Sequence, residues 1–117
     1  MANLEIEKGT INDIVVTVSE RITLSAPFYL FVLQSKFNKS EFRYFNAVNI
    51  SNNRQRYDEF MVTETTGASA SNAEVEVFTG GWYYSIYESV TQTLDINNTT
   101  GIILENGLLI VTDTNYK

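Results

Sequence analysis

Apolar and polar residues alternate one by one along much of the chain, which is the pattern of strands that bury one face. The clearest example is the aromatic segment 82–88, which follows a glycine pair at positions 80 and 81. We expect a central strand here, whose core-facing side carries Trp82, Tyr84 and Ile86. The opposite side of the same strand then carries Tyr83 and Tyr87. Aromatic and β-branched residues favour such a pleated surface.

Shorter alternating segments of the same kind occur earlier in the chain, at residues 4–7, 14–19, 41–45, 57–63 and 74–77. Each predicts a strand with one buried face, such as Phe60 and Val62 in the segment 57–63. Residues 28–33 are apolar on both sides, so a helical turn and a strand covered on both faces are the two alternatives. Six residues with aromatic and β-branched side chains favour the strand.

The last apolar stretch contains a local turn signal. Asn106-Gly107 separates residues 102–104 from residues 108–111. This dipeptide between apolar runs predicts a type I′ hairpin, because both central residues need positive φ. Strands that recur about every ten residues, with no capped helical pattern, predict an all-β chain: an immunoglobulin-like β-sandwich of about seven antiparallel strands, with residues 1–117 as one domain.

Composition narrows the chemistry. The 117 residues carry a formal net charge of −6 and include no cysteine and no histidine. A metal site built on thiolates or imidazoles is therefore excluded, and the usual general base is missing. We predict no catalytic residues, no cofactor and no metal site, and hence no enzyme. The acidic balance also argues against binding to nucleic acid, which needs a basic footprint.

We expect no secretory signal, no membrane-spanning segment and no calcium loop in this sequence. The N-terminal residues have no basic and apolar stretches of the secretory type, and no apolar run is long enough to cross a membrane. Residues 95–101 resemble a calcium loop only weakly. The sixth position is not glycine and the twelfth is Asn106 rather than glutamate, so we reject an EF-hand.

Four residues are the candidates for an interaction surface: Tyr83, Tyr87, Leu108 and Ile110. The two tyrosines lie opposite the expected core, and the two aliphatic residues belong to a run that is apolar on both faces. Tyrosine and tryptophan are enriched at protein interfaces because they bury area while keeping a polar tip. A sugar-binding platform and burial under loops of the same chain are the alternatives.

Several motifs together indicate a resemblance to a known group of proteins. They are Gly-x-Trp-x-Tyr-x-Ile-Tyr-Glu at 80–88, Ile-Val-Val-Thr-Val-Ser at 14–19, Phe-Tyr-Leu-Phe-Val-Leu at 28–33, Arg-Tyr-Asp-Glu-Phe at 56–60 and Leu-Glu-Asn-Gly-Leu-Leu-Ile-Val at 104–111. In this order the chain resembles small β-sandwich virion proteins of tailed bacteriophages that infect Bacteroidetes, of the crAss-like phage type.

The resemblance implies a non-enzymatic structural protein of the virion, made in the host cytoplasm and docked on the capsid as an auxiliary or decoration protein. Its partners would be the major capsid protein or neighbouring structural subunits, with no nucleic acid and no membrane. A position in the tail or in the head–tail connector is an alternative. A carbohydrate-binding β-sandwich module is the second class of function, supported by the aromatic residues at 82, 83 and 87.

Overall fold

The computed structural model describes residues 2–18, 22–24, 27–50 and 58–113. Arg56 and Tyr57 of the quoted motif, and part of the loop expected after the fourth strand, lie outside these residues. The described part of the chain contains eight strands and two short 3₁₀ turns. They are β1 (Ala2–Glu7), β2 (Ile11–Val16), β3 (Phe28–Ser35), β4 (Phe42–Ala47), β5 (Asp58–Glu64), η1 (Ala70–Asn72), β6 (Glu74–Val75), β7 (Gly80–Ser89), η2 (Ile96–Asn98) and β8 (Ile103–Thr112).

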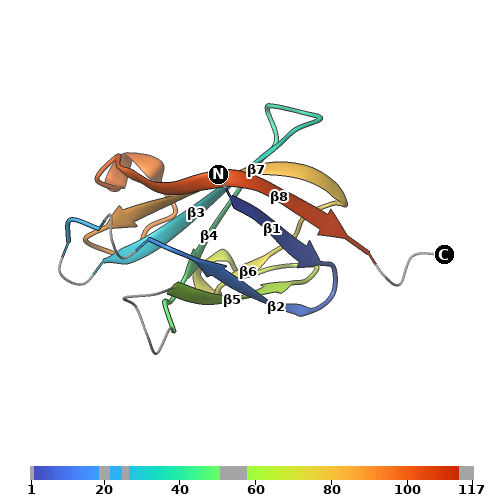
Figure 1. Ribbon diagram of the computed structural model, residues 1–117, viewed down its shortest axis with the longest axis horizontal. Coiled ribbons are helices and arrows are strands. Elements are labelled where there is room, and N and C mark those ends of the chain that lie inside the picture. The colour runs from blue at the N-terminus through green and yellow to red at the C-terminus, as the bar shows by residue number, and fades with distance from the viewer. Residues whose placement is uncertain (1, 19–21, 25–26, 51–57, 114–117) are drawn as a thin grey trace.

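The strands form two sheets that pack as layers (Figure 1). The five-stranded sheet has the order β1-β8-β7-β3-β4, and the three-stranded sheet has the order β2-β5-β6. This confirms the prediction of an all-β chain. Neither of the two short helical turns in the described residues has the length or the hydropathy that a membrane-spanning helix needs.

Two strand pairs differ from the expected antiparallel arrangement. β1 pairs with β8 in parallel, and β5 pairs with β6 in parallel over two residues. The other pairs are antiparallel. The prediction of an entirely antiparallel sandwich was therefore wrong. Alternation within a segment fixes which face is buried but carries no information about which distant strand lies beside it.

The core lies between the two sheets and follows the predicted alternation. Trp82, Tyr84 and Ile86 of β7 are almost completely buried. From the other sheet, Phe60 meets the ring of Phe31 edge to face, with centroids 5.0 Å apart. Residues 28–33 form a strand rather than a helical turn, as predicted.

The expected hairpin at Asn106-Gly107 is absent, because these residues lie in the middle of the continuous strand β8. Gly107 pairs with Ala2 on one side and with Tyr84 on the other. Pairing with β7 along most of β8, and with β1 from Gly107 to Thr112, outweighs a local turn preference that concerns two residues. β8 is instead an inner strand of the five-stranded sheet, between β1 and β7.

Candidate functional site

The four predicted interface residues all lie on β7 and β8, on the side of the five-stranded sheet that faces away from the core. Tyr83 is directly opposite Leu108 in the antiparallel pair, and Ile110 pairs with Gly81 in the next outward row. Tyr83 and Ile110 are exposed, whereas Leu108 and Tyr87 are half-buried. The structure therefore brings Tyr83, Leu108 and Ile110 together.

Tyr87 lies farther along the same strand. It lies four positions after Tyr83, which corresponds to about 13 Å in an extended chain. A register shift follows Ile86, and Tyr87 then pairs with Ile103 and with the buried Leu30. Tyr87 thus belongs to the same face but to a different part of it.

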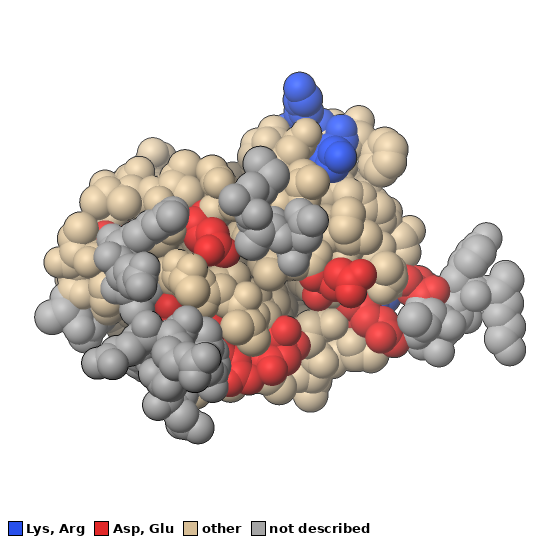
Figure 2. All heavy atoms as spheres, in the orientation of Figure 1, with Lys and Arg blue, Asp and Glu red and all other residues tan. Residues whose placement is uncertain are grey.

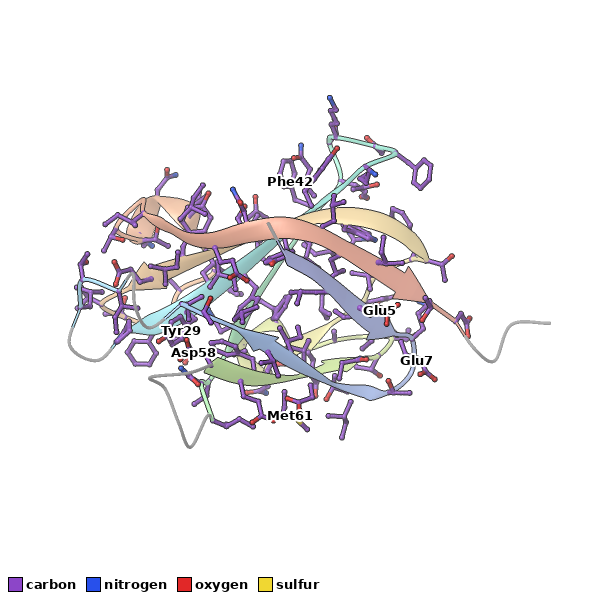
Figure 3. The ribbon with its side chains drawn as sticks, viewed as in Figure 1. Glu5, Glu7, Tyr29, Phe42, Asp58 and Met61 are labelled. Atoms are coloured by element: carbon purple, nitrogen blue, oxygen red, sulfur yellow. The ribbon has the colours of Figure 1, made fainter. Side chains whose placement is uncertain are left out.

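The same face continues onto β4, where two aromatic side chains join it. The row that contains Leu108 and Tyr83 runs on through Gln34 to Phe42. Phe42 stacks on Tyr44, with ring centroids 6.1 Å apart and planes 20° apart. Figure 3 shows Phe42 on the side of β4 that points away from the core. Neither residue is among the four predicted from the sequence, although their alternation on one strand was a signal for a shared face.

We call this surface the outer aromatic face and define it by Tyr83, Leu108, Ile110, Phe42 and Tyr44. The outward residues Leu30 and Val32 of β3 are buried and do not belong to it. By the pairing registers, no outward position on β3, β4, β7 or β8 carries a charged residue. The nearest charges lie at its borders, with Glu5 and Glu7 on β1. Opposite them, the Lys36 ammonium lies 5.9 Å from the ring centre of Tyr83.

The space-filling view also shows the basic and the acidic residues on separate parts of the surface (Figure 2). The basic residues visible in this view gather at the hairpin between β3 and β4, and acidic residues gather over β1 and the lower sheet. A neutral surface with aromatic residues and a polar or charged border is the usual anatomy of a protein interface.

A buried carboxylate closes one end of the sandwich. Glu88 of β7 accepts hydrogen bonds from the Thr23 N–H at 2.9 Å, the Thr23 hydroxyl at 2.7 Å and the Leu24 N–H at 3.2 Å. The Thr100 hydroxyl adds a longer one. Burial raises the pKa of Glu88, but these hydrogen bonds lower it by more, so the pKa lies below its usual value. Glu88 therefore fixes two loops.

Glu64 does the same at the opposite end of the sandwich. Its carboxylate accepts from the Gly9 N–H at 2.9 Å and from the Val77 N–H at 3.0 Å, and it forms an ion pair with Lys8 at 3.4 Å. These bonds hold the turn between β1 and β2 against the segment that leads into β7. Glu64 and Glu88 are thus buried carboxylates whose charge is met by hydrogen-bond donors.

A different pair of carboxylates lies on the outer face of the three-stranded sheet. Asp13 of β2 and Glu59 of β5 are on neighbouring strands, diagonal to each other across the pair. The hydrogen bond from Asp13 raises the pKa of Glu59, with smaller contributions from partial burial and from charge repulsion by Asp13. Within the described residues, no three histidine, cysteine, aspartate or glutamate side chains come together in a way that could hold a metal ion.

The segment 95–101, rejected above as a calcium loop, has a structural role in the described chain. Asp95 caps the short turn η2, and its side chain accepts a hydrogen bond from the Asn97 N–H at 2.9 Å. The Asp95 carboxylate therefore serves its own loop.

Comparison with known proteins adds information about the fold. The chain matches no protein-family model and no curated protein. Among solved structures it is similar to a crystal structure of a "putative glycoside hydrolase" from Bacteroides vulgatus ATCC 8482, with a TM-score of 0.51 and 8% sequence identity. The similarity covers 96% of this chain and 17% of that chain, so this chain spans about a sixth of the length of that protein. At this identity, what the two chains share is a fold.

Proposed function

We propose that this chain is an immunoglobulin-like sandwich that acts as a non-enzymatic docking module and binds a protein partner through the outer aromatic face. The observation that carries the proposal is the absence of charged residues from the outward positions of four adjacent strands. A solvated sheet face normally alternates apolar residues toward the core with polar and charged residues toward water. This face instead presents exposed aromatic and aliphatic side chains, among them Tyr83, Phe42 and Ile110.

The immunoglobulin-like part of the proposal rests on strand order. In variable-type immunoglobulin domains, one sheet contains the C, F and G strands with C′ added beside C. The order β8-β7-β3-β4 corresponds to G-F-C-C′, and the antiparallel pair β2–β5 corresponds to B and E. The described part of the chain has eight strands, one more than the expected seven, and one of them is the two-residue strand β6.

The phage setting rests on the sequence resemblance. In that setting the partner is the major capsid protein or a neighbouring structural subunit, and the module occupies the capsid surface; the tail and the connector are alternative positions. An outward sheet face suits the broad surface of a neighbouring subunit better than a small ligand, which needs a concave pocket.

The decisive experiment compares the two outer faces of the sandwich. In a phage that encodes the protein, Tyr83→Asp with Ile110→Asp places two charges on the outer aromatic face. The matched control, Ile11→Asp with Val15→Asp, places two charges on the outer face of the other sheet, at residues that are more exposed. We expect the first variant to be lost from purified particles and the control to be incorporated at the normal copy number.

Thermal unfolding of both purified variants separates docking from folding, because both should retain a cooperative transition. Normal incorporation of the Tyr83 and Ile110 variant would exclude this face as the docking surface.

A carbohydrate-binding module is the second candidate, and one observation favours it. Three exposed aromatic rings, those of Tyr83, Phe42 and Tyr44, lie on one side of the five-stranded sheet, and aromatic faces can stack on sugar rings. Glycan-array binding that is abolished by Tyr83→Ala, but is unchanged by Val15→Ala, would favour this function over docking on a protein.

A further inference from the structure

The border of the three-stranded sheet at β2 is a separate surface feature, which we call the β2 edge. β2 pairs with β5 on one side, and in the order β2-β5-β6 no strand of the described residues lies beyond it. β1 and β2 are joined by a short turn and diverge from it, so β1 does not continue the ladder (Figure 1). The described part of the chain therefore leaves one side of β2 open.

The backbone hydrogen bonds identify which groups point to this open side. The Glu64 N–H donates to Thr10 O at 3.0 Å, so this pair, just before the start of β2, is a hydrogen-bonded one. Hydrogen-bonded and non-hydrogen-bonded pairs alternate along an antiparallel ladder. The even-numbered residues of β2 therefore bond to β5, whereas the N–H and C=O groups of Ile11, Asp13 and Val15 point away from it.

The described chain covers parts of its other sheet borders with its own side chains. At the end of β1, the Asn12 amide accepts from the Glu7 N–H at 2.9 Å and donates to Glu7 O at 3.2 Å. At β4, Arg43 Nε donates to Glu76 O at 2.8 Å, which holds the segment after β6 beside this strand. The three odd-numbered residues of β2 make no such contact within the described residues.

The side chains beside this open backbone indicate which strand fits there. Ile11 and Val15 are 65% and 51% exposed, and Asp13 is exposed between them on the same face. Glu59 lies diagonal to Asp13, and the hydrogen bond between the two carboxyl groups raises the pKa of Glu59. Opposite charges across a strand pair are stabilising, whereas like charges are destabilising. The β2 edge therefore favours a strand whose outward residues are apolar, basic and apolar in turn.

We propose that the β2 edge binds an extended segment of a partner protein by strand addition, with a lysine or arginine opposite Asp13 and apolar residues opposite Ile11 and Val15. The main chain of the segment pairs with the three open residues, and its cation lies beside both Asp13 and Glu59. Main-chain hydrogen bonds supply affinity in this mode of recognition, and the alternate side chains supply specificity. A small ligand cannot pair with a row of backbone groups in this way.

A second copy of this chain fits the β2 edge poorly, although identical open edges can pair with each other. Antiparallel pairing of two β2 strands centred on Asp13 places the two Asp13 carboxylates opposite each other, with both Glu59 carboxylates nearby. The formal net charge of −6 on each chain adds to this repulsion. The carboxylate that disfavours self-association is thus the one that favours a basic partner.

This contact is independent of the outer aromatic face, which lies on the other sheet. The expected incorporation of Ile11→Asp with Val15→Asp into particles concerns docking through that face alone. Failure of docking there would leave strand addition at the β2 edge unaffected, and the reverse also holds.

The test uses two blocked heptapeptides in titrations followed by two-dimensional ¹H–¹⁵N NMR. One is Thr-Val-Thr-Arg-Thr-Val-Thr, and the other has glutamate in place of arginine. Both sequences read the same in either direction, so they fit antiparallel and parallel addition alike. We expect shifts concentrated at residues 11–16 and a dissociation constant at least fivefold lower for the arginine peptide. Equal dissociation constants, no binding, or shifts elsewhere would overturn the proposal.

Hydrogen exchange tests the backbone pairing directly. In the free protein, the amide hydrogens of the even-numbered residues of β2 should exchange slowly, because they bond to β5, and those of Ile11, Asp13 and Val15 should exchange quickly. Saturation with the arginine peptide should slow exchange at these three residues at least fivefold. Slow exchange there without peptide would mean that the edge is already covered, and would overturn the proposal.

A charge reversal tests the role of Asp13. Asp13→Arg should invert the preference, so that the glutamate peptide binds more tightly, whereas Glu5→Arg, the same change at an exposed residue of the other sheet, should leave the preference unchanged. An unchanged preference in Asp13→Arg would overturn the proposed recognition. Sedimentation that shows a dimer of the native chain, dissociated by Val15→Arg, would assign the edge to a second copy and overturn the choice of partner.

Discussion

The two outer faces of the sandwich differ in chemistry although both are made of alternating strands. The five-stranded sheet presents the outer aromatic face, on which four strands carry no charged outward residue. The three-stranded sheet presents aliphatic side chains such as Ile11 and Val15 together with the Asp13–Glu59 pair. Both faces expose apolar side chains, but only the second carries charges among them.

The difference shows that exposure of apolar residues alone does not identify a docking face. Single exposed aliphatic side chains are common on soluble proteins. A carboxylate pair in their midst must lose its hydration if a partner covers it, which is unfavourable unless the partner supplies positive charge. The outer aromatic face can be covered without that loss. This is why the two faces respond differently to the changes below.

The largest expected effect on stability is the difference between truncating an inward and an outward side chain of the same strand. Trp82 is fully buried and its indole N–H donates to Phe78 O at 3.2 Å. Trp82→Ala should lower the free energy of unfolding by about 3–5 kcal/mol. Tyr83→Ala, one residue along and 44% exposed, should lower it by about 1 kcal/mol or less. Urea unfolding of both variants measures the contrast, and similar losses would mean that the outward face is part of the core.

The second largest expected effect on stability comes from the buried carboxylate of Glu88 in the five-stranded sheet. Glu88→Gln keeps the size of the side chain but replaces hydrogen bonds to a charged group by weaker ones, which should lower the free energy of unfolding by about 2 kcal/mol. Gln34→Glu, on the outer aromatic face, is a control that adds a charge instead of removing one and should have a smaller effect on folding.

The pH dependence of this loss follows from the lowered pKa of Glu88. Its contribution to stability is complete above the unfolded pKa, about 4.3 for glutamate, and is lost as the pH falls through the folded value. The difference between the native chain and Glu88→Gln should therefore shrink on acidification. A difference that stays constant down to pH 2 would contradict this role.

The smallest expected effect concerns the Asp13–Glu59 pair on the outer face of the three-stranded sheet. Its dependence on pH has the opposite sign to that of Glu88. The raised pKa of Glu59 means that the Asp13–Glu59 pair contributes most below pH 4.3 and loses that contribution as the pH rises through the folded value. Asp13→Asn should therefore slightly raise the thermal midpoint at pH 7, where it removes the repulsion between two carboxylates, and slightly lower it at pH 3, where it replaces the carboxyl–carboxyl hydrogen bond. Glu5→Gln, which removes one acidic charge from the border of the other face, controls for the general effect of net charge.

The faces of individual strands could be predicted from the sequence, because burial of alternate side chains leaves a direct trace in the residue pattern. Trp82 and Tyr84 are inside and Tyr83 is outside, as the alternation predicted. The partners of a strand leave no such trace. The Asn106-Gly107 signal was misleading because the pairing of β8 with β1 and β7 on its two sides depends on residues distant in sequence.

The candidate site was predictable in part for the same reason. Tyr83, Leu108 and Ile110 were named from local patterns, but their meeting with Phe42 and Tyr44 required the order of the strands in the sheet. Glu88 was not named as a candidate, although it follows Trp82, Tyr84 and Ile86 on the inward side of β7. Its burial depends on Thr23 and Thr100, two loop residues that no local pattern connects to it.

The position of β8 between β1 and β7 also determines which sheet can be completed first during synthesis. The strands of the three-stranded sheet have all been synthesised once residue 75 has left the ribosome, whereas the five-stranded sheet needs residues up to 112. At translation rates of about 5–20 residues per second, this delay is about 2–7 s. During that interval β1 has no neighbour in its sheet, because Gly107, the partner of Ala2, has not yet been synthesised or released from the ribosome. The outer aromatic face is thus the last surface of the sandwich to be completed during synthesis.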